Sequence, residues 1–497
     1  MLESAIQGLL SIFDLRTLPL LLAGIPIGVI FGILPGLSGL TALAVLMPFI
    51  FGMEPGRGLA FLLAAHAVIY TGGSVSAVLL NIPGAPPNAA TLIDGFPMTQ
   101  KGQGGRALGI ALAGSGLGGV VGGIVLVVMV FAVRPIVMSF GLPEYFFLIL
   151  LGISFIAVLG RESAVKGLIS GVMGIFLSLV GVQTTTGEPR FWFGSWYFLD
   201  GFGIIPVALG IFAIPEVVDL FTGKGTIARV ERASVTPGLV WEGVKDIFRH
   251  WRLFLQSSAI GTGVGIIPGI GGETAPFVAY GLAKQTSKHP EEFGRGSIEG
   301  VLAPEAANNA KEGGSLLPTL AFGIPGSSAM AILLGAFLLV GLKPGPLFLE
   351  ENLDIAFTLA STVIFANILA AFVLLLLAGK LANLAFIRGT ILGPFVLILV
   401  VVGSYVINGN LMDVVCVFAF GVLGYLMKVL DYNRPALFLG LVLGSSAELY
   451  FGLAVSTYGP LFFLRPIALT LFGITLFVLF YDWIRAMVGR RRHASSR

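Results

Sequence analysis

The sequence predicts an all-α polytopic membrane protein of roughly 10 to 12 spans, built from two duplicated repeats with Pro-Gly broken helices. Three observations support this fold class: the composition, a series of long apolar runs, and short motifs that occur twice in the same order. Of the 497 residues, 56% are hydrophobic and 11% are charged, and the mean hydropathy is +0.96. An average soluble chain has about 25% charged residues, so a water-soluble globule is excluded.

The apolar runs form two series, separated by a basic segment. We expect a first membrane repeat over 1–221, a basic linker over 222–252, a second membrane repeat over 253–484 and a basic tail over 485–497. Short basic loops stay on the cytoplasmic side of a membrane, so the linker and the tail, with the C-terminus, are predicted to be cytoplasmic. The net charge of +3 gives no reason to expect a nucleic-acid partner, and the lipid bilayer is the predicted environment.

The internal repeat is clearest around a Pro-Gly pair. Segment 28–42 aligns without gaps with segment 261–275, and eight of the aligned pairs are identical. A second echo pairs Gly72-Gly73-Ser74 with Gly313-Gly314-Ser315, and each copy leads to an Ile-Pro-Gly sequence. Motifs that recur in the same order predict a duplicated unit.

Breaks at matching positions of two membrane repeats are typical of a transporter's substrate site, because freed backbone groups must face protein or a cavity. We expect the breaks at Pro35 and Pro268 to meet around one cavity near the bilayer midplane. The start of a half-helix favours an anionic group, and nearby hydroxyls add donors. The alternative is that the glycines only permit close packing and the prolines only kink their helices. The predicted substrate-binding residues are Pro35, Gly36, Ser38, Gly39, Thr41, Gly72, Gly73, Ser74, Asn81, Pro268, Gly269, Gly272, Thr274, Gly313, Gly314 and Ser315.

The most polar stretch of the second half is 303–315. In a helix, Glu305, Asn308 and Asn309 would share one face. Their carboxylate and amide oxygens suit a hard cation such as sodium, or a proton relay through the acid, so we predict a coupling-ion site here. Glu273, next to the second Pro-Gly break, is a further candidate. The alternative is a solvated loop that continues from the charged segment beginning at Lys284.

Other polar residues in apolar surroundings are assigned structural roles. Asp94 is expected in a turn or a cap, and His66 is expected to be a hydrogen-bonded core residue rather than a proton carrier. The sequence has no phosphate-binding loop, no His-Glu-x-x-His and no Gly-x-Ser-x-Gly. These absences predict that the protein is not an enzyme and needs no cofactor beyond sodium or a proton as coupling ion.

The motifs resemble one known family, the large transmembrane subunit of the bacterial tripartite tricarboxylate transporters. The likeness covers residues 5–485, and its most specific run is Ala-Pro-Glu-Ala-Ala-Asn-Asn-Ala at 303–310. It rests also on Tyr70-x-Gly-Gly-Ser, Asn81-Ile-Pro-Gly, Thr91-x-x-Asp-Gly and Gly323-Ile-Pro-Gly.

The resemblance implies a secondary importer in the bacterial inner membrane that is driven by an ion gradient. Its substrate would be a tricarboxylate or a related organic anion. It would work with a small membrane subunit and a periplasmic solute-binding protein. The residues themselves leave an alternative open, which is a channel or scaffold subunit whose Gly-rich motifs serve packing only.

Overall fold

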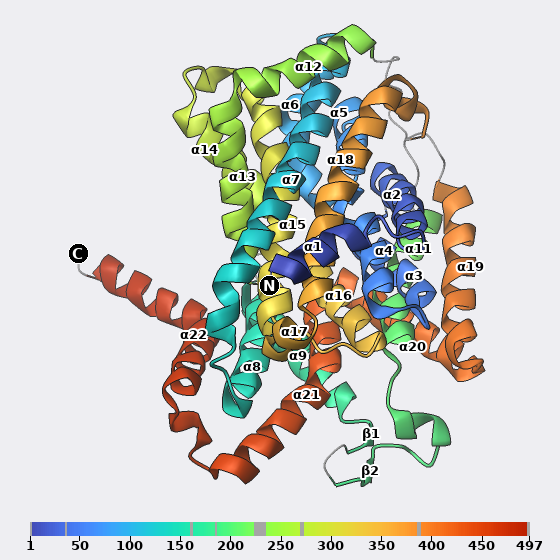
Figure 1. Cartoon of the computed structure of the whole chain (residues 1–497), viewed down its shortest axis with the longest axis vertical. Helices are drawn as coiled ribbons and strands as arrows, with labels where there is room; N and C mark the ends of the chain where they lie inside the picture. The colour runs from blue at the N-terminus through green and yellow to red at the C-terminus, as the bar shows by residue number, and fades with distance from the viewer. Residues whose placement is uncertain are drawn as a thin grey trace.

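The computed structural model describes residues 2–34, 37–159, 163–183, 186–222, 235–268, 273–384 and 389–494. Nearly all of this part is helical, and several long helices run along the long axis of the molecule (Figure 1). An all-α polytopic fold is therefore confirmed.

The first half of the chain contains eleven α-helices, a short hairpin and four 3-10 or π segments among its described residues. These elements are α1 (Leu2–Ser11), α2 (Leu18–Ile33), α3 (Gly39–Leu46), η1 (Met47–Ile50), α4 (Pro55–Ala67), α5 (Ile69–Leu80), η2 (Pro86–Asn88), α6 (Ala89–Gln100), α7 (Gly104–Val137), α8 (Leu142–Leu159), α9 (Ala164–Ser178), β1 (Gly181–Val182), β2 (Pro189–Arg190), η3 (Trp196–Asp200), α10 (Ile204–Ala208), the π-helix η4 (Leu209–Ala213) and α11 (Ile214–Thr222).

The second half contains eleven further α-helices in the described ranges. They are α12 (Pro237–Arg249), α13 (Trp251–Ile266), α14 (Ala275–Thr286), α15 (Ile298–Phe322), α16 (Ser328–Leu339), α17 (Pro346–Glu351), α18 (Leu353–Leu384), α19 (Gly389–Asn408), α20 (Leu411–Val429), α21 (Arg434–Tyr458) and α22 (Pro466–Ala494), with η5 (Pro290–Glu292) and η6 (Phe462–Leu464) between them.

Six helical segments in the described ranges are long and apolar enough to cross a membrane. They are Pro55–Leu80, Gly104–Val137, Ile204–Thr222, Leu353–Leu381, Leu411–Val429 and Arg434–Tyr458. Shorter apolar helices, among them α2, α9 and α16, have 10–17 residues because Pro and Gly interrupt their runs. The expected 10 to 12 spans thus stay a prediction.

Three helices, α2, α5 and α15, end at breaks that contain Pro and Gly. α2 stops before the first Pro-Gly pair, and α3 starts again at Gly39, where the Ser38 hydroxyl accepts a hydrogen bond from the amide of Thr41 at 3.2 Å. α5 and α15 both end on a left-handed residue, Asn81 (φ 59°) and Gly323 (φ 67°), and each is followed by Ile-Pro-Gly. After the second of these breaks, Ser327 caps α16.

α15 is the central helix of the structure, and it is buried from Gly300 to Ala321 although it carries charged side chains. It packs between α7 and α13, and glycines on both neighbours lie directly against its backbone. Gly122 of α7 faces the carbonyl of Ala310, and Gly265 of α13 faces the carbonyl of Lys311. Such close backbone approach leaves no room for a Cβ atom, which explains the small residues on these helices.

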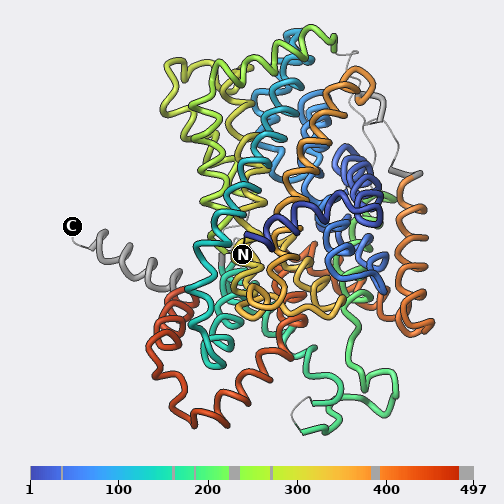
Figure 2. Tube along the Cα trace, in the orientation of Figure 1, coloured from blue at the N-terminus to red at the C-terminus, as the bar shows by residue number. Residues whose placement is uncertain are grey.

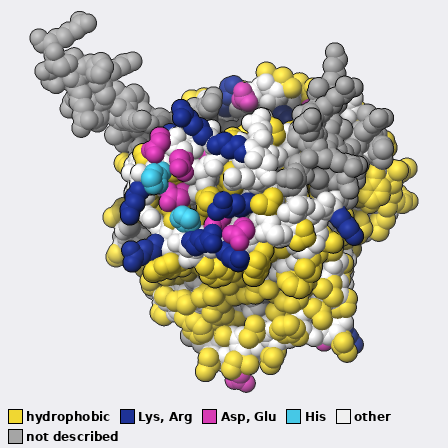
Figure 3. Space-filling model, turned by 90° about the horizontal axis from the view of Figure 1, so that it is seen from above, with side chains coloured by type: hydrophobic (Ala, Val, Ile, Leu, Met, Phe, Trp, Pro, Cys, Tyr) yellow, Lys and Arg dark blue, Asp and Glu magenta, His cyan; other side chains and the backbone are white. Residues whose placement is uncertain are grey.

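Long helices from distant parts of the sequence surround this core. Figures 1 and 2 show α18 beside α7, and their residues are in contact. On the outside, α19 exposes Phe395, Ile398, Val402 and Val406 at the helical spacing that suits a lipid-facing stripe. Seen from above, charged side chains gather over one part of the visible face, whereas hydrophobic side chains fill the lower part of the view (Figure 3).

Two small elements cover the ends of the bundle. α12 lies across the top (Figure 1), where Asp246 forms ion pairs with Arg106 of α7 at 2.6 Å and with Arg249 at 2.9 Å. At the bottom, β1 and β2 pair antiparallel, with Gly181 opposite Arg190. Arg190 is held by Glu448 of α21 at 2.7 Å, so this ion pair fastens the hairpin to the bundle.

Candidate functional site

A cavity lies where the helix breaks of the two halves converge. It encloses about 400 Å³ of space, open solvent at its mouth included. The breaks contribute residues 38–40, 85–87, Glu273 and 327–329, and Tyr70 and Lys311 complete the wall. The residues next to both Pro-Gly breaks, Ser38 and Glu273, therefore line one cavity.

The cavity wall contains a buried lysine. The ammonium of Lys311 lies 2.5 Å from Oε1 of Glu312 and 4.0 Å from the ring centre of Tyr70. Oε2 of the same glutamate lies 3.1 Å from Nε2 of His66. An ammonium group has three donors. Glu312 takes one of them, which leaves donors for an oxygen atom in the cavity.

A second polar cluster surrounds Glu305, which is fully buried in α15. Its Oε1 atom accepts hydrogen bonds from Thr91 at 2.5 Å and from Ser74 at 2.7 Å. Ser115 and Asn88 also interact with this carboxyl group. No basic side chain pairs with Glu305 within the described ranges, and its Oε2 atom has no hydrogen-bond partner there.

The other predicted coupling-ion residues are placed differently. Nδ2 of Asn309 donates to Thr71 at 2.7 Å and to Asn367 of α18 at 2.6 Å, so this amide joins three helices. Both amide atoms of Asn308 are buried without a partner among the described residues. Glu273 is exposed at the mouth of the cavity. All of stretch 303–315 is buried in α15, so the solvated-loop alternative is wrong, although the loop preceding α15 is exposed.

The predicted substrate residues do not all lie in one place. Ser38 and Gly39 line the cavity, and Pro268 and Thr274 flank the second break. Thr41 bonds to Ser38, and Ser74 belongs to the Glu305 cluster. Asn81 is the C-cap of α5, and the hydroxyl of Ser315 is buried without a partner in the described ranges. The other described residues are glycines that lie against neighbouring groups: Gly72, Gly73, Gly313 and Gly314. Pro35, Gly36, Gly269 and Gly272 lie outside the described residues.

The sequence of the chain is also similar to those of known proteins. Residues 18–439 match the family model described as tripartite tricarboxylate transporter TctA family. The chain belongs to the TctA family.

Two relatives of this TctA-family chain come from Agrobacterium vitis. One is an uncharacterized 52.8 kDa protein in the TAR-I ttuC′ 3′ region, which is 33% identical over 91% of this chain and 90% of the relative. The other is an uncharacterized protein in the TAR-II ttuC′ 3′ region, 35% identical over 44% of this chain and 90% of the relative. No solved structure matches the chain. TctA is a family of transporters, and this chain is therefore a membrane component of a transport system.

Four residues of the cavity and of the Glu305 cluster were not among the predicted site residues. Lys311 lies inside the polar stretch that was singled out, and its charge in an apolar half was a usable signal. Thr91 and Tyr70 were noticed only as parts of motifs. Asn88 carried no signal, because its contacts depend on the fold of the chain around α6.

Asp94 of α6 binds the loop that precedes α15. Its Oδ1 atom accepts hydrogen bonds of 2.8 Å from the amides of Gly294, Gly296 and Ser297, and Oδ2 accepts one from Tyr280 at 2.9 Å. The expected turn or cap role is wrong, because Asp94 lies inside α6 and α15 is capped by Ser297, whose hydroxyl accepts a hydrogen bond from the amide of Gly300. His66 is a hydrogen-bonded core residue, as expected.

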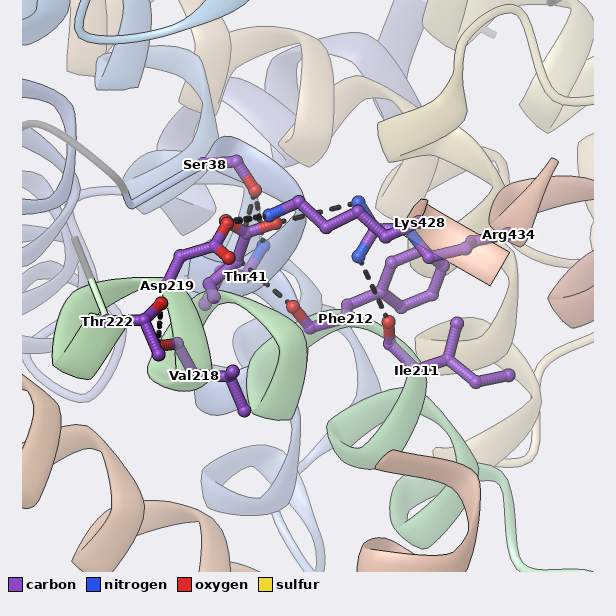
Figure 4. A network of polar contacts seen from close by, with 10 residues as sticks. Ser38, Thr41, Ile211, Phe212, Val218, Asp219, Thr222, Lys428 and Arg434 are labelled. Carbon is purple, nitrogen blue, oxygen red and sulfur yellow. Dashed lines mark hydrogen bonds and ion pairs between the residues drawn. The ribbon is translucent and has the colours of Figure 1, made fainter. Parts of the chain in front are cut away.

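A polar network supports the cavity wall from behind (Figure 4). The hydroxyl of Thr41, next to Ser38, donates to the carbonyl of Phe212 in the π-helix η4 at 3.4 Å. Arg434 donates to the neighbouring carbonyl of Ile211 at 3.2 Å. Both side chains thus donate to neighbouring carbonyls of the π-helix, an element that often lies at functional sites. Lys428 of α20 joins the same network by binding Glu216 at 2.9 Å and Asp219.

A larger cavity lies between α8, α16 and α21. It encloses about 600 Å³, and its wall is mainly apolar, with Tyr145, Tyr450 and Lys343 among the lining residues. Its lysine, Lys343, is exposed, whereas Lys311 in the wall of the smaller cavity is buried. Within the described part of the chain, no group of three His, Cys, Asp or Glu residues is placed to hold a metal ion.

Proposed function

We propose that this chain is the translocating subunit of a secondary importer that carries organic carboxylates, tricarboxylates or related anions, across the bacterial inner membrane. The observation that supports it is the buried ammonium of Lys311 in the wall of a cavity bounded by helix breaks of both halves. A buried cation with free donors and an aromatic neighbour suits a carboxylate. Membership of the TctA family makes transport the activity to test.

The helix starts around the cavity strengthen the preference for an anion. Ser38 caps α3 and Ser327 caps α16, and both caps line the cavity. Two helix N-termini therefore bring their partial positive charges and unpaired amides to one place. Glu273, at the mouth, would repel an anion there, which favours binding deeper in, beside Lys311.

We infer that the two halves arose by duplication. Matching glycines make matching contacts: Gly28 lies on the carbonyl of Ala65 as Gly261 lies on that of Ala307. In the same way, Gly72 lies on the carbonyl of Val29, and Gly314 lies on the carbonyl of Thr262. These contacts equate Gly72 with Gly314, one residue later than the alignment of the Gly-Gly-Ser motifs suggests. The extra residue of the second half would then precede the motif.

The importer would be driven by a sodium or proton gradient, and Glu305 is the coupling residue that we favour. Of the four candidates, Glu305, Asn308, Asn309 and Glu273, it is the acid that is fully buried and lacks a basic partner in the described part of the structure. The tripartite family implies a small membrane subunit and a periplasmic solute-binding protein as partners.

Uptake of labelled di- and tricarboxylates by cells that carry all three subunits tests the proposal. We expect Lys311→Gln to abolish uptake while the protein remains in the membrane at the wild-type level. Lys284→Gln, which removes an exposed lysine of α14, is the matched control and should transport normally. Normal uptake by Lys311→Gln, at an unchanged KM, would remove the cavity as the substrate site.

A further inference from the structure

We propose that a sodium ion binds between α5, α6, α7 and α15, coordinated by the carboxylate of Glu305 and the hydroxyls of Ser74, Thr91 and Ser115. The role of this ion in coupling rests on the proposed transport function, whereas its binding does not. The site is separate from the cavity beside Lys311.

Glu305 is fully buried, and within the described ranges no lysine, arginine or histidine forms an ion pair with it. An ionised carboxylate buried without a compensating cation is strongly unfavourable. Either a proton or a bound cation must therefore accompany this side chain.

The atoms around the carboxylate favour a cation. Thr91 and Ser74 direct their hydroxyls to Oε1 at 2.5 and 2.7 Å, and Ser115 interacts with the same carboxyl group. The Oε2 atom is buried and has no partner in the described part of the chain. A proton needs one acceptor oxygen, but this cluster offers two carboxylate and three hydroxyl oxygens. Hard cations prefer such an all-oxygen set.

Backbone and amide contacts hold the hydroxyls in place. The Asn88 amide donates to the carbonyl of Tyr70 at 2.9 Å and to the Ser74 hydroxyl at 3.1 Å, and the Ser74 oxygen lies 2.9 Å from the same carbonyl. Thr71 holds Ser115 at 3.2 Å. The four ligands come from four helices, and all four side chains are fully buried. They are therefore ordered before an ion arrives, which lowers the entropic cost of binding.

The sodium site and the cavity share a wall. Tyr70 bonds to Ser74 and Asn88 through its carbonyl, and its ring lies below Lys311 in the cavity. Asn88 directly follows Pro86 and Pro87, which line the same cavity. An ion that draws α5, α6 and α15 together thus orders the cavity wall, which gives a physical route for coupling.

Direct binding to the purified full chain in detergent, with no carboxylate present, tests the site. We expect ²²Na⁺ to bind saturably, and unlabelled Na⁺, but not K⁺ at equal ionic strength, to compete. Na⁺ should also raise the thermal unfolding temperature relative to K⁺. A wild-type protein that shows no Na⁺-specific binding at any pH overturns the proposal and leaves Glu305 as a proton carrier.

Two pairs of variants localise the ion. Thr91→Val keeps the size of the side chain but removes its oxygen, and should weaken sodium binding about tenfold, whereas Thr91→Ser should bind like the wild type. Glu305→Gln should lose binding, whereas Glu350→Gln, at an exposed position of α17, should not. Unchanged sodium affinity in both Thr91→Val and Glu305→Gln overturns the site. If Glu305→Gln fails to fold, the Thr91 pair alone decides.

Binding and transport can fail separately. Sodium binding that depends on Thr91, with carboxylate uptake that ignores Lys311, would retain the ion site and reject the substrate site. Uptake that requires Lys311, with no sodium binding, would retain the substrate site and reject the ion site.

Discussion

The Oδ1 atom of Asp94 lies 2.8 Å from the backbone nitrogen of Ser297, the residue that precedes α15. Through this contact a carboxylate of the first half holds the loop that leads into the central helix of the second half. α6 also carries Thr91 and α15 also carries Glu305, so the contact helps to set the spacing between these two side chains.

Replacing Asp94 should destabilise the protein. Asp94→Ala leaves the amides of Gly294, Gly296 and Ser297 without their acceptor, and an unpaired donor that is buried, as that of Ser297 is, costs about 1–3 kcal/mol. We expect a lower thermal unfolding temperature in detergent, with a smaller decrease for Asp94→Asn, which keeps an acceptor oxygen. Asp200→Asn, at an exposed position in η3, is the control. Equal stability of Asp94→Ala and the control would show that these hydrogen bonds contribute nothing.

Two glycines on α13 should respond oppositely to the same substitution. A Cβ at Gly261 would meet the backbone of Ala307, whereas a Cβ at Gly263 would meet nothing. Gly261→Ala should therefore cost about 1–3 kcal/mol by forcing α13 away from α15. Gly263→Ala should stabilise the helix by up to about 1 kcal/mol. Thermal unfolding of both variants measures the difference, and a loss of stability in both would contradict the packing described for this helix pair.

The docking of α12 on α7 should weaken in acid. Burial raises the pKa of Asp246, but hydrogen bonds from Arg106 and Arg249 outweigh burial and hold this pKa below the ordinary value. A depressed pKa contributes stability that is present above the unfolded value of about 4 and is lost as the pH falls through the folded value.

Hydrogen exchange of the α12 amides can measure this loss. We expect exchange, after correction for its intrinsic pH dependence, to accelerate below about pH 4. Asp246→Asn should show fast exchange at neutral pH and little further change in acid. Protection of α12 that is the same at pH 7 and in acid would contradict the role of this ion pair.

The orientation of the chain can be read from cysteine labelling. The native Cys416 is buried, so introduced cysteines can be compared against a low background. By the positive-inside rule, a cysteine at Lys288 should resist a membrane-impermeant maleimide in whole cells, and a cysteine at Glu188, in the hairpin at the opposite end, should react. The reverse pattern would invert the proposed topology and place the charged top face outside the cytoplasm.

Much of the fold and part of the site could be predicted from the sequence. The membrane environment follows from composition, and helix breaks follow from the local geometry of Pro and Gly, so both are properties of short segments. For that reason Ser38 and Glu273 could be placed beside one cavity before its shape was known. The number of membrane spans could not be predicted, because helices interrupted by Pro or Gly are too short to be recognised as spans by their length alone.

Tertiary structure alone decided which polar groups act together. Stretch 303–315 is polar enough to be a solvated loop, and it is buried because α4, α5, α6 and α18 supply partners for its side chains. Glu312 meets His66, Glu305 meets Thr91, and Asn309 meets Asn367. Each partner is far away in the sequence, so no local pattern shows which side chains form a pair. The free energy of a buried polar group depends on its neighbours in space, so the sequence determined where the chain breaks, and the packing of the helices decided what those breaks enclose.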